Sequence, residues 1–252
     1  MHADDANGVR TITFDRPEVK NAFTMEVASE LADRIEETDP EEHSAVVLTG
    51  EGDAFSAGGD IQSMAEREMP PREAYETIQE TFGRLAETML SSPVPIVAKV
   101  NGDAVGAGLA IVAASDFAYA VDTARFSAAF VKVGLVPDTA ATIMLPRIVG
   151  LRTAKELTFT GDLISAEEAA EKDVLNEAVP EGELDATVED LLDTLRNRPT
   201  RTIGMAKQAM HANLGPWRDW LDTELLVQSQ AYVTPEHKEG VSAFLEGRPP
   251  EF

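Results

Sequence analysis

The sequence predicts an α/β domain of repeated strand–turn–helix units that is followed by a helical C-terminal region. Short apolar runs with β-branched residues recur at Ala45–Thr49, Ile96–Val100 and Phe117–Val121. The first two lead into glycine-rich turns and then into helical patterns, as units of an α/β fold do. Beyond residue 140 the apolar periodicity is helical throughout. We therefore expect the strands and both glycine-rich turns in the first part of the chain.

In the N-terminal part, particular residues mark where the expected strands and helices begin and end. Val9–Asp15 alternates between polar and apolar residues as a strand does. An amphipathic helix is expected to begin at Thr24 and to end before Pro40. Pro71 suits the first position of a long helix, which Ser91–Pro95 ends. A short Ala-rich helix is expected after the second glycine-rich turn.

The C-terminal part is expected to be helical over 142–149, 152–158, 166–171, 184–196, 201–212, 217–232 and 236–246. Prolines at 180, 199, 216 and 235 separate several of these segments. We expect residues 1–195 to form a catalytic core. Residues 196–252 would then form a helical region for oligomerisation and pocket closure, with packing of this region onto its own core as the alternative.

Composition predicts an ordinary globular protein. With 252 residues, of which 43% are hydrophobic, the chain can bury a full core as one domain. There is no cysteine, so disulfides are excluded and a reducing cytoplasm is the expected location. His2–Arg10 is polar and acidic, unlike a secretory leader. The longest apolar stretch, 104–114, is too short to span a bilayer.

The charge is strongly negative, with 45 acidic against 21 basic residues and a formal net charge of −24. The acids are dispersed along the chain, so its surface should repel nucleic acid and anionic membranes. The pattern resembles proteins of salt-accumulating halophiles, in which strong salt screens the self-repulsion. An ordinary acidic protein is the alternative interpretation.

Two glycine-rich turns carry the strongest functional signal. They read FSAGGD at Phe55–Asp60 and NGDAVGAG at Asn101–Gly108. A turn from a strand into a helix start directs backbone N–H groups toward one point, which suits an anion. Two such turns suggest an oxyanion hole with two main-chain donors. In the alternative interpretation the glycines only permit tight turns.

Several motifs along the chain resemble the enoyl-CoA hydratase/isomerase, or crotonase, family. They are FDRPEVKNAF (14–23), AFSAGGDI (54–61), PIVAKVNGDAVGAGLAIVAASDF (95–117), ARFSAAFVKVGLVPDTAATIMLPRIVG (124–150), LTFTGDLISAEEA (157–169) and EGVSAFLEGRPPEF (239–252). The resemblance implies a spiral of ββα units with a helical trimerisation region. It also implies acyl-CoA thioester substrates, a homotrimer or dimer of trimers, and no cofactor or metal beyond the coenzyme A of the substrate.

Mapped onto this chain, the family's two oxyanion donors are the N–H groups of Ala57 and Ala107. The resemblance places substrate contacts at Val19, Ala57, Gly58, Gly59, Asp60, Gly106 and Phe130. Asp60 is also a candidate helix cap.

The two glutamates that activate water in the family's hydratases map onto Ala110 and Phe130, which cannot carry protons. Asp138 in GLVPDTAAT remains as a candidate acid and base. Some isomerases of the family, including epoxyphenylacetyl-CoA isomerases, carry their carboxylate at this point. One carboxylate suffices to shift a double bond, and apolar neighbours would raise its pKa. Alternatively, Asp138 only caps the following helix.

Other activities stay open. Hydration through a nonstandard water site is the second candidate, and acyl-CoA binding without chemistry is a third. GLVPDTAAT also resembles 4-chlorobenzoyl-CoA dehalogenases, but their histidine position falls on Gly83. The histidines of this chain, His2, His43, His211 and His237, are expected in polar segments far from the motifs.

The coenzyme A end departs from the family pattern. Asp53 stands where many relatives have a basic residue, and the C-terminal basic pair is reduced to Gly247–Arg248. Arg16 and Lys20 remain near Val19 as cations, and Arg16 has an alternative structural role. We therefore expect weak electrostatic steering of the substrate.

Overall fold

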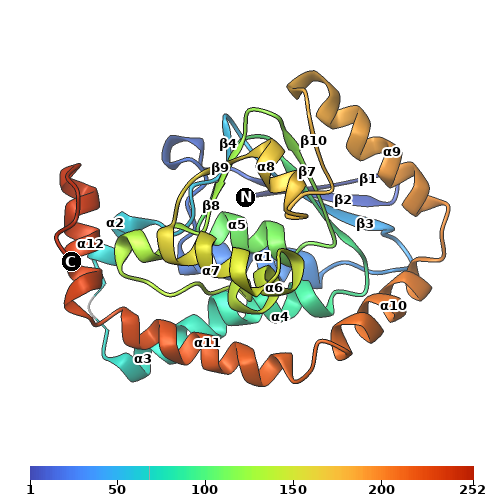
Figure 1. Cartoon of the computed structure of the whole chain (residues 1–252). Coiled ribbons are helices and arrows are strands. Elements are labelled where there is room, and N and C mark those ends of the chain that lie inside the picture. The colour runs from blue at the N-terminus through green and yellow to red at the C-terminus, as the bar shows by residue number, and fades with distance from the viewer. Residues whose placement is uncertain (68) are drawn as a thin grey trace.

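The computed structural model describes residues 1–67 and 69–252, and it contains two β-sheets (Figure 1). The six-stranded sheet has the order β1 (His2–Ala6), β2 (Val9–Phe14), β3 (Ala45–Gly50), β5 (Ile96–Val100), β7 (Phe117–Val121) and β10 (Glu177–Val179). The four-stranded sheet has the order β4 (Ala54–Ser56), β6 (Asp103–Val105), β8 (Arg125–Ser127) and β9 (Ile164–Ser165). β1 and β9 pair antiparallel to their neighbours, and the remaining pairs are parallel.

The repeating unit places one strand in each sheet. β3, β5 and β7 belong to the larger sheet, and the strand that follows each of them, β4, β6 or β8, belongs to the smaller one. This is the expected α/β spiral. Short strands form part of both predicted turn segments, since β4 overlaps the start of Phe55–Asp60 and β6 lies within Asn101–Gly108. Strands of three residues are too short to show an alternating pattern.

The helices lie close to the expected positions. Their bounds are α1 (Met25–Glu36), α2 (Ile61–Ala65), α3 (Pro71–Ile78), α4 (Arg84–Ser91), α5 (Ala107–Ala114), α6 (Ala141–Ile148), α7 (Leu151–Thr160), α8 (Ala166–Glu171), α9 (Leu184–Arg196), α10 (Thr200–Ala212), α11 (Trp217–Ala231) and α12 (Pro235–Glu246). Thr24 caps α1 by accepting from the Val27 N–H. The expected long helix from Pro71 contains a π-helical segment, Gln79–Gly83, between α3 and α4.

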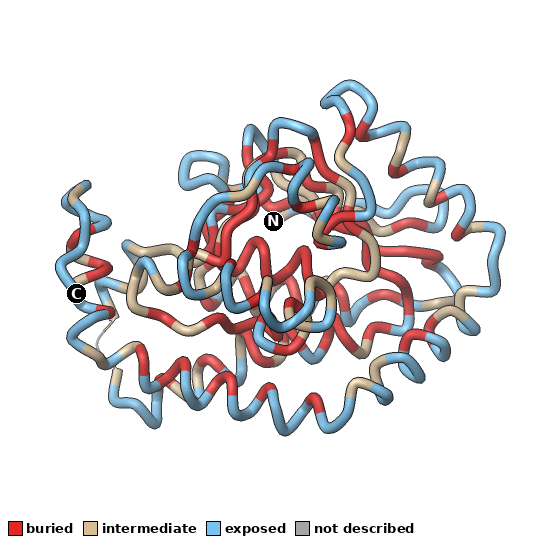
Figure 2. Tube along the Cα trace, in the orientation of Figure 1, coloured by how far each residue is buried: buried red, intermediate tan, exposed pale blue. Residues whose placement is uncertain are grey.

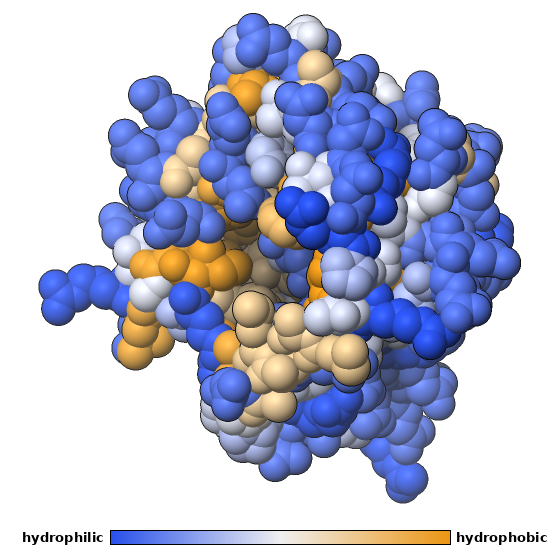
Figure 3. All heavy atoms as spheres, turned by 90° about the vertical axis from the view of Figure 1, so that its right-hand side faces the viewer, coloured by the Kyte–Doolittle hydropathy of each residue, from blue (hydrophilic) through white to orange (hydrophobic). Residues whose placement is uncertain are grey.

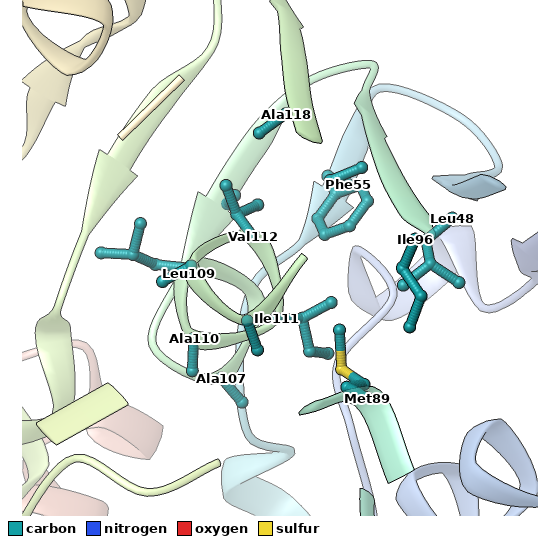
Figure 4. Close-up of a cluster of buried hydrophobic side chains, with 14 of the residues drawn as sticks. Leu48, Phe55, Met89, Ile96, Ala107, Leu109, Ala110, Ile111, Val112 and Ala118 are labelled. Atoms are coloured by element: carbon teal, nitrogen blue, oxygen red, sulfur yellow. The ribbon is translucent and has the colours of Figure 1, made fainter. Parts of the chain in front are cut away.

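The core surrounds α5. All eight residues of α5 are buried, and none carries a charge, so the helix has no solvent-facing side. Figure 2 shows buried residues concentrated in the sheets and in this helix, whereas α9 to α12 are exposed on their outer sides. Figure 4 shows Phe55, Met89 and Ile96 gathered around it. The packing around α5 therefore fixes the position of its N-terminus.

The C-terminal helices run around the outside of this core (Figure 1). α11 packs against α3 and α6, and α12 packs against α2 and the 3-10 helix Ala129–Val133. The expected boundary after residue 195 falls at the last turn of α9. Hydrophilic atoms cover most of the molecular face shown in Figure 3. Within the described residues, no helix is long and apolar enough to cross a membrane.

Candidate active site

The two glycine-rich turns lie against each other. A Cβ on Gly58 would lie 2.7 Å from the Val105 carbonyl oxygen and 3.4 Å from the Ala107 nitrogen. Gly58 has φ +94° and Gly106 has φ +54°, both in the region that favours glycine. A Cβ on Gly108 would lie 2.6 Å from the Ser56 carbonyl oxygen. Glycine at 58 and 108 thus lets the two turns, far apart in sequence, approach to van der Waals contact.

The two expected oxyanion donors differ in their present partners. Ala107 is the first residue of α5, so its N–H has no acceptor within the helix, and none of the described residues accepts from it. The positive end of the helix dipole lies at the same point. In contrast, the Ala57 N–H donates to the Lys20 carbonyl over 2.8 Å. The sequence did not indicate this bond, because it depends on the αL conformation of Lys20.

A pocket of about 810 Å³ opens beside these turns. Its lining includes most of the expected contact residues, namely Val19, Ala57, Gly59, Asp60, Gly106, Ala107, Phe130 and Asp138. Gly58 lies between the turns instead of on the pocket wall. Phe244 and Leu245 of α12 also line the pocket, so the C-terminal region forms part of its wall.

Asp138 is a buried carboxyl group on this wall, with 5% of its surface exposed. Its Oδ1 accepts from the Thr139 hydroxyl over 3.0 Å, and its Oδ2 accepts from the Gln228 amide over 3.1 Å. Burial raises the pKa of Asp138 to about 6, although both hydrogen bonds act to lower it. The group can therefore both accept and donate a proton near neutral pH.

The alternative that Asp138 caps the next helix was wrong. α6 begins at Ala141, after the left-handed residues Thr139 and Ala140. Glu224 of α11 performs the capping instead. Its carboxyl oxygens accept from the Ala140 N–H over 2.8 Å and from the Thr142 N–H over 2.9 Å, and the group also contacts the Thr142 hydroxyl.

Sequence reasoning missed three residues of this site, Glu224, Gln228 and Tyr232. Gln228 and Tyr232 line the pocket, and Glu224 lies behind Asp138. Burial raises the pKa of Glu224 to about 8, with a further contribution from the Asp138 charge. Burial also raises the pKa of Tyr232. Their spacing of four residues places them on one face of a helix, and that polar stripe was the available signal.

Few cations are available at the pocket. Arg16 bonds the Asp60 carboxylate over 2.9 Å and the Ala22 carbonyl over 2.6 Å, so it is structural as well as pocket-lining. Asp60 also caps α2 through the Ser63 N–H, as expected. Lys20 and Lys132 are exposed on the lining, and neither forms an ion pair with a described residue.

The C-terminal arginine is not free for phosphate. Arg248 forms ion pairs with Glu239 and Glu246. Beside Arg248, the pKa of Glu239 falls to about 2. This pairing strengthens the expectation that electrostatic steering of an anionic substrate is weak.

The comparisons with known proteins agree with this geometry. The model of the enoyl-CoA hydratase/isomerase family matches residues 4–252. A probable enoyl-CoA hydratase of Rhodobacter capsulatus is 36% identical, over 98% of this chain and 95% of that protein. The 1,2-epoxyphenylacetyl-CoA isomerase of Escherichia coli is 33% identical, over 97% and 95%.

The chain belongs to the enoyl-CoA hydratase/isomerase family. Its fold agrees, because the crystal structure of an enoyl-CoA hydratase from Mycobacterium avium subsp. paratuberculosis superposes with a TM-score of 0.89. That structure is 31% identical, and the alignment covers 100% of this chain and 97% of the other.

Within this family the chain has no carboxylate at the two positions that the resemblance assigned to the hydratase glutamates. Ala110 lies inside α5 with 1% of its surface exposed. Phe130 presents an aromatic ring to the pocket and is 7% exposed. Neither residue can carry a proton, and the carboxyl groups on the pocket lining are those of Asp60, Glu66 and Asp138.

The structure agrees only in part with the positions expected for the histidines. A Cβ on Gly83 would lie 2.6 Å from Leu225 Cδ1, so a histidine at this position would have to displace the end of the Leu225 side chain. The expectation that the histidines lie in polar segments far from the motifs was wrong for His237, and His43 is buried as well. The His237 ring is 5% exposed, lies 5.0 Å from the Tyr232 ring, and bonds the Val133 carbonyl over 2.7 Å. His237 became buried because α12 folds back onto the 3-10 helix.

Proposed function

We propose that this enzyme shifts a double bond in an enoyl-CoA or related aryl-acetyl-CoA thioester, with Asp138 as the acid and base. The observation that carries the proposal is a buried carboxyl group on the same pocket as the Ala107 amide, with Ala110 and Phe130 at the hydratase positions. The name of the Escherichia coli relative, an isomerase, supports the same chemistry.

In the proposed reaction, the thioester oxygen accepts hydrogen bonds from the Ala107 and Ala57 N–H groups. The Ala57 amide reaches the substrate by sharing or leaving its bond with the Lys20 carbonyl. Asp138 removes a proton from C2 of a 3-enoyl thioester, and the electrons move onto the thioester oxygen as a dienolate. Protonated Asp138 then returns a proton to C4, which leaves a 2-enoyl product. Main-chain donors stabilise the charge of the intermediate without titrating.

The pH dependence follows from the buried carboxyl group. Asp138 must be ionised to accept the first proton, and burial places its pKa at about 6. We expect kcat to fall as the pH drops below that value. Glu224, with a pKa of about 8, stays protonated while Asp138 ionises, so it adds no negative charge at that step.

The coenzyme A part of the substrate carries phosphates, for which the pocket offers a few cations. Lys20 and Lys132 lie on the pocket lining and are the groups that we propose to contact the phosphates of coenzyme A, while Val19 contacts its adenosine through the backbone. Because the net charge is −24, we expect this contact to work best at high ionic strength, where the surface is screened. We also propose that the acidic surface is of the halophile type and that the protein is cytoplasmic.

We also propose that residues 196–252 support a homotrimer or a dimer of trimers. Large apolar side chains are exposed on α10 and α12, among them Met205, Met210 and Phe244, with 61%, 68% and 62% of their surface accessible in the single chain. Exposed apolar area of this kind is typical of subunit interfaces. Size-exclusion chromatography with light scattering in molar KCl measures the mass of the assembly and so tests this oligomeric state.

The test of function is a panel of 2-enoyl-, 3-enoyl- and dienoyl-CoA thioesters in molar KCl, followed by NMR and mass spectrometry. We expect movement of the double bond at constant mass with the wild-type enzyme. The Asp138→Asn variant should bind the substrates without converting them. A gain of one water with a 2-enoyl substrate would instead establish hydration through a nonstandard water site. Binding without any conversion by the wild type would leave an acyl-CoA-binding protein.

A further inference from the structure

α11 presents a polar stripe to the interior of the molecule. Glu224, Gln228 and Tyr232 follow one another at intervals of four residues. Glu224 is 4% exposed and Gln228 only 1%. Their neighbour Gln230 is exposed on the opposite side of the same helix. Buried polar groups on a helix need partners, and each of the first two finds its partners in the segment around Asp138.

The orientation of the Gln228 amide is determined by its contacts. Its Oε1 accepts from the Val136 N–H over 2.9 Å, and its Nε2 donates to Asp138 Oδ2 over 3.1 Å. A backbone N–H can only donate, so the amide oxygen must face Val136. The amide nitrogen is thereby directed at the carboxylate. Gln228 thus bridges the residue two positions before Asp138 and the carboxylate itself.

Glu224 holds the other side of the same segment. It accepts from the N–H groups of Ala140 and Thr142, two and four positions after Asp138. Thr139 and Ala140 have φ of +56° and +63°, which is unfavourable for residues with a Cβ. Such a conformation persists where surrounding contacts hold it. α11 therefore binds the chain on both sides of the carboxyl group.

We propose that Gln228 is the residue that positions the Asp138 carboxylate for proton transfer, so that α11 completes the acid–base site. The proposal rests on the proposed function for its kinetic readout. The Thr139 hydroxyl holds Oδ1, and Gln228 holds Oδ2. Each carboxylate oxygen retains a second lone pair for a proton of the substrate.

The charged groups around Asp138 determine in which direction its pKa moves when Gln228 is lost. Glu224 of α11 and Tyr232, directly after the end of α11, interact with the Asp138 charge, and both are acids that add no positive charge; Arg67 acts on Tyr232. The 3-10 helix contributes the apolar Phe130 to the same pocket. The hydrogen bond from Gln228 lowers the pKa of Asp138 against the effect of burial. Its removal must therefore raise that pKa.

The decisive variants are Gln228→Leu, which removes the amide, and Gln228→Glu, which retains an acceptor for Val136 but replaces the donor. The matched control is Gln230→Leu on the exposed side of α11. We expect kcat at pH 7 to fall roughly 10- to 100-fold in both Gln228 variants, with a smaller change in KM. The acid limb of kcat should move up by roughly one pH unit. The control should match the wild type.

A second readout does not require activity. Protein labelled with ¹³C at the aspartate carboxyl carbons gives an Asp138 resonance, which is assigned by its absence in Asp138→Asn. We expect its titration midpoint to rise in Gln228→Glu and Gln228→Leu. An unchanged midpoint and an unchanged kcat profile in a folded Gln228 variant would overturn the proposal. If Asp138→Asn keeps full isomerase activity, the proposed function fails, whereas the titration still tests Gln228 alone.

Discussion

The two walls of the pocket differ in the kind of group that they present. One wall is main chain, built from the turns after β4 and β6 and the first residue of α5. The other wall is side chain, with Asp138 held by Gln228 and Glu224 behind it. Backbone amides have no protonation equilibrium near neutral pH, whereas the buried carboxyl groups do. In the proposed reaction, the first wall would therefore stabilise charge at any pH, and the second would move protons only near the pKa values of its carboxyl groups.

This difference predicts which changes each wall tolerates. On the main-chain wall, most side chains can change as long as the backbone keeps its path. On the side-chain wall, the backbone can shift slightly, but the chemical identity of one group decides the activity. The following variants test that contrast, from the largest expected effect to the smallest.

Asp138→Asn should have the largest effect, because it removes the group that carries the proton in the proposed reaction. We expect kcat for double-bond migration to fall by roughly 10²- to 10⁴-fold, while substrate binding is retained. Asparagine can still accept from Gln228 and contact Thr139, so the fold should persist. Isothermal calorimetry with a substrate analogue and steady-state kinetics measure the two effects separately. Asp190→Asn, on an exposed site, is the control.

Ala107→Pro removes a main-chain donor and should lower kcat by roughly 10²- to 10³-fold. Proline is tolerated at the first position of a helix, so α5 should still form. Ala107→Ser retains the N–H and is the matched control, for which we expect activity close to the wild type. Equal activity of the proline and serine variants would show that the Ala107 amide has no part in the reaction.

Glu224→Ala tests the support behind the carboxyl group. It leaves the buried Ala140 N–H without an acceptor, so the free energy of unfolding should fall by about 1–3 kcal/mol. Urea denaturation at pH 6, where Glu224 with its pKa of about 8 is uncharged, measures this loss of hydrogen bonds. Asp222→Ala on the exposed face of α11 should change stability little. A loss of the same size in Asp222→Ala would mean that α11 itself is disturbed.

Asp138→Asn should also stabilise the folded protein at neutral pH. Burial raises the pKa of Asp138 from 3.8 to about 6, so between these values the folded state holds a proton that the unfolded chain has released. The free energy of unfolding of the wild type therefore decreases as the pH rises through this window, by roughly 3 kcal/mol at most. Asparagine does not titrate, so the variant lacks this pH-dependent loss of stability. The melting temperature of the variant relative to the wild type should thus rise between pH 4 and pH 7.

The two walls also differ in how far the sequence alone revealed them. The glycine turns are local signals, since Gly58 and Gly106 sit in the turns they form, and a short Ala-rich helix was expected after the second turn, where α5 lies. The partners of Asp138 are not local. Gln228 lies 90 positions away from it, and no turn or cap signal connects α11 to this segment.

Other differences between the sequence-based expectations and the structure also have specific causes. The bond from the Ala57 N–H to the Lys20 carbonyl requires αL backbone at Lys20, for which a non-glycine residue gives no sequence signal. The burial of His237 requires α12 to fold onto the 3-10 helix. The absence of a carboxylate at positions 110 and 130 was visible in the sequence, because it depends on residue identity alone.

The transfer of an isotope tests most directly that one carboxyl group carries the proton between two carbons. A 3-enoyl-CoA substrate deuterated at C2 is converted in ordinary water, and the 2-enoyl product is examined by NMR for deuterium at C4. Because Asp138 is only 5% exposed, we predict that a measurable fraction of the label appears at C4. A product with no label at C4, or one that has gained water, would contradict the account.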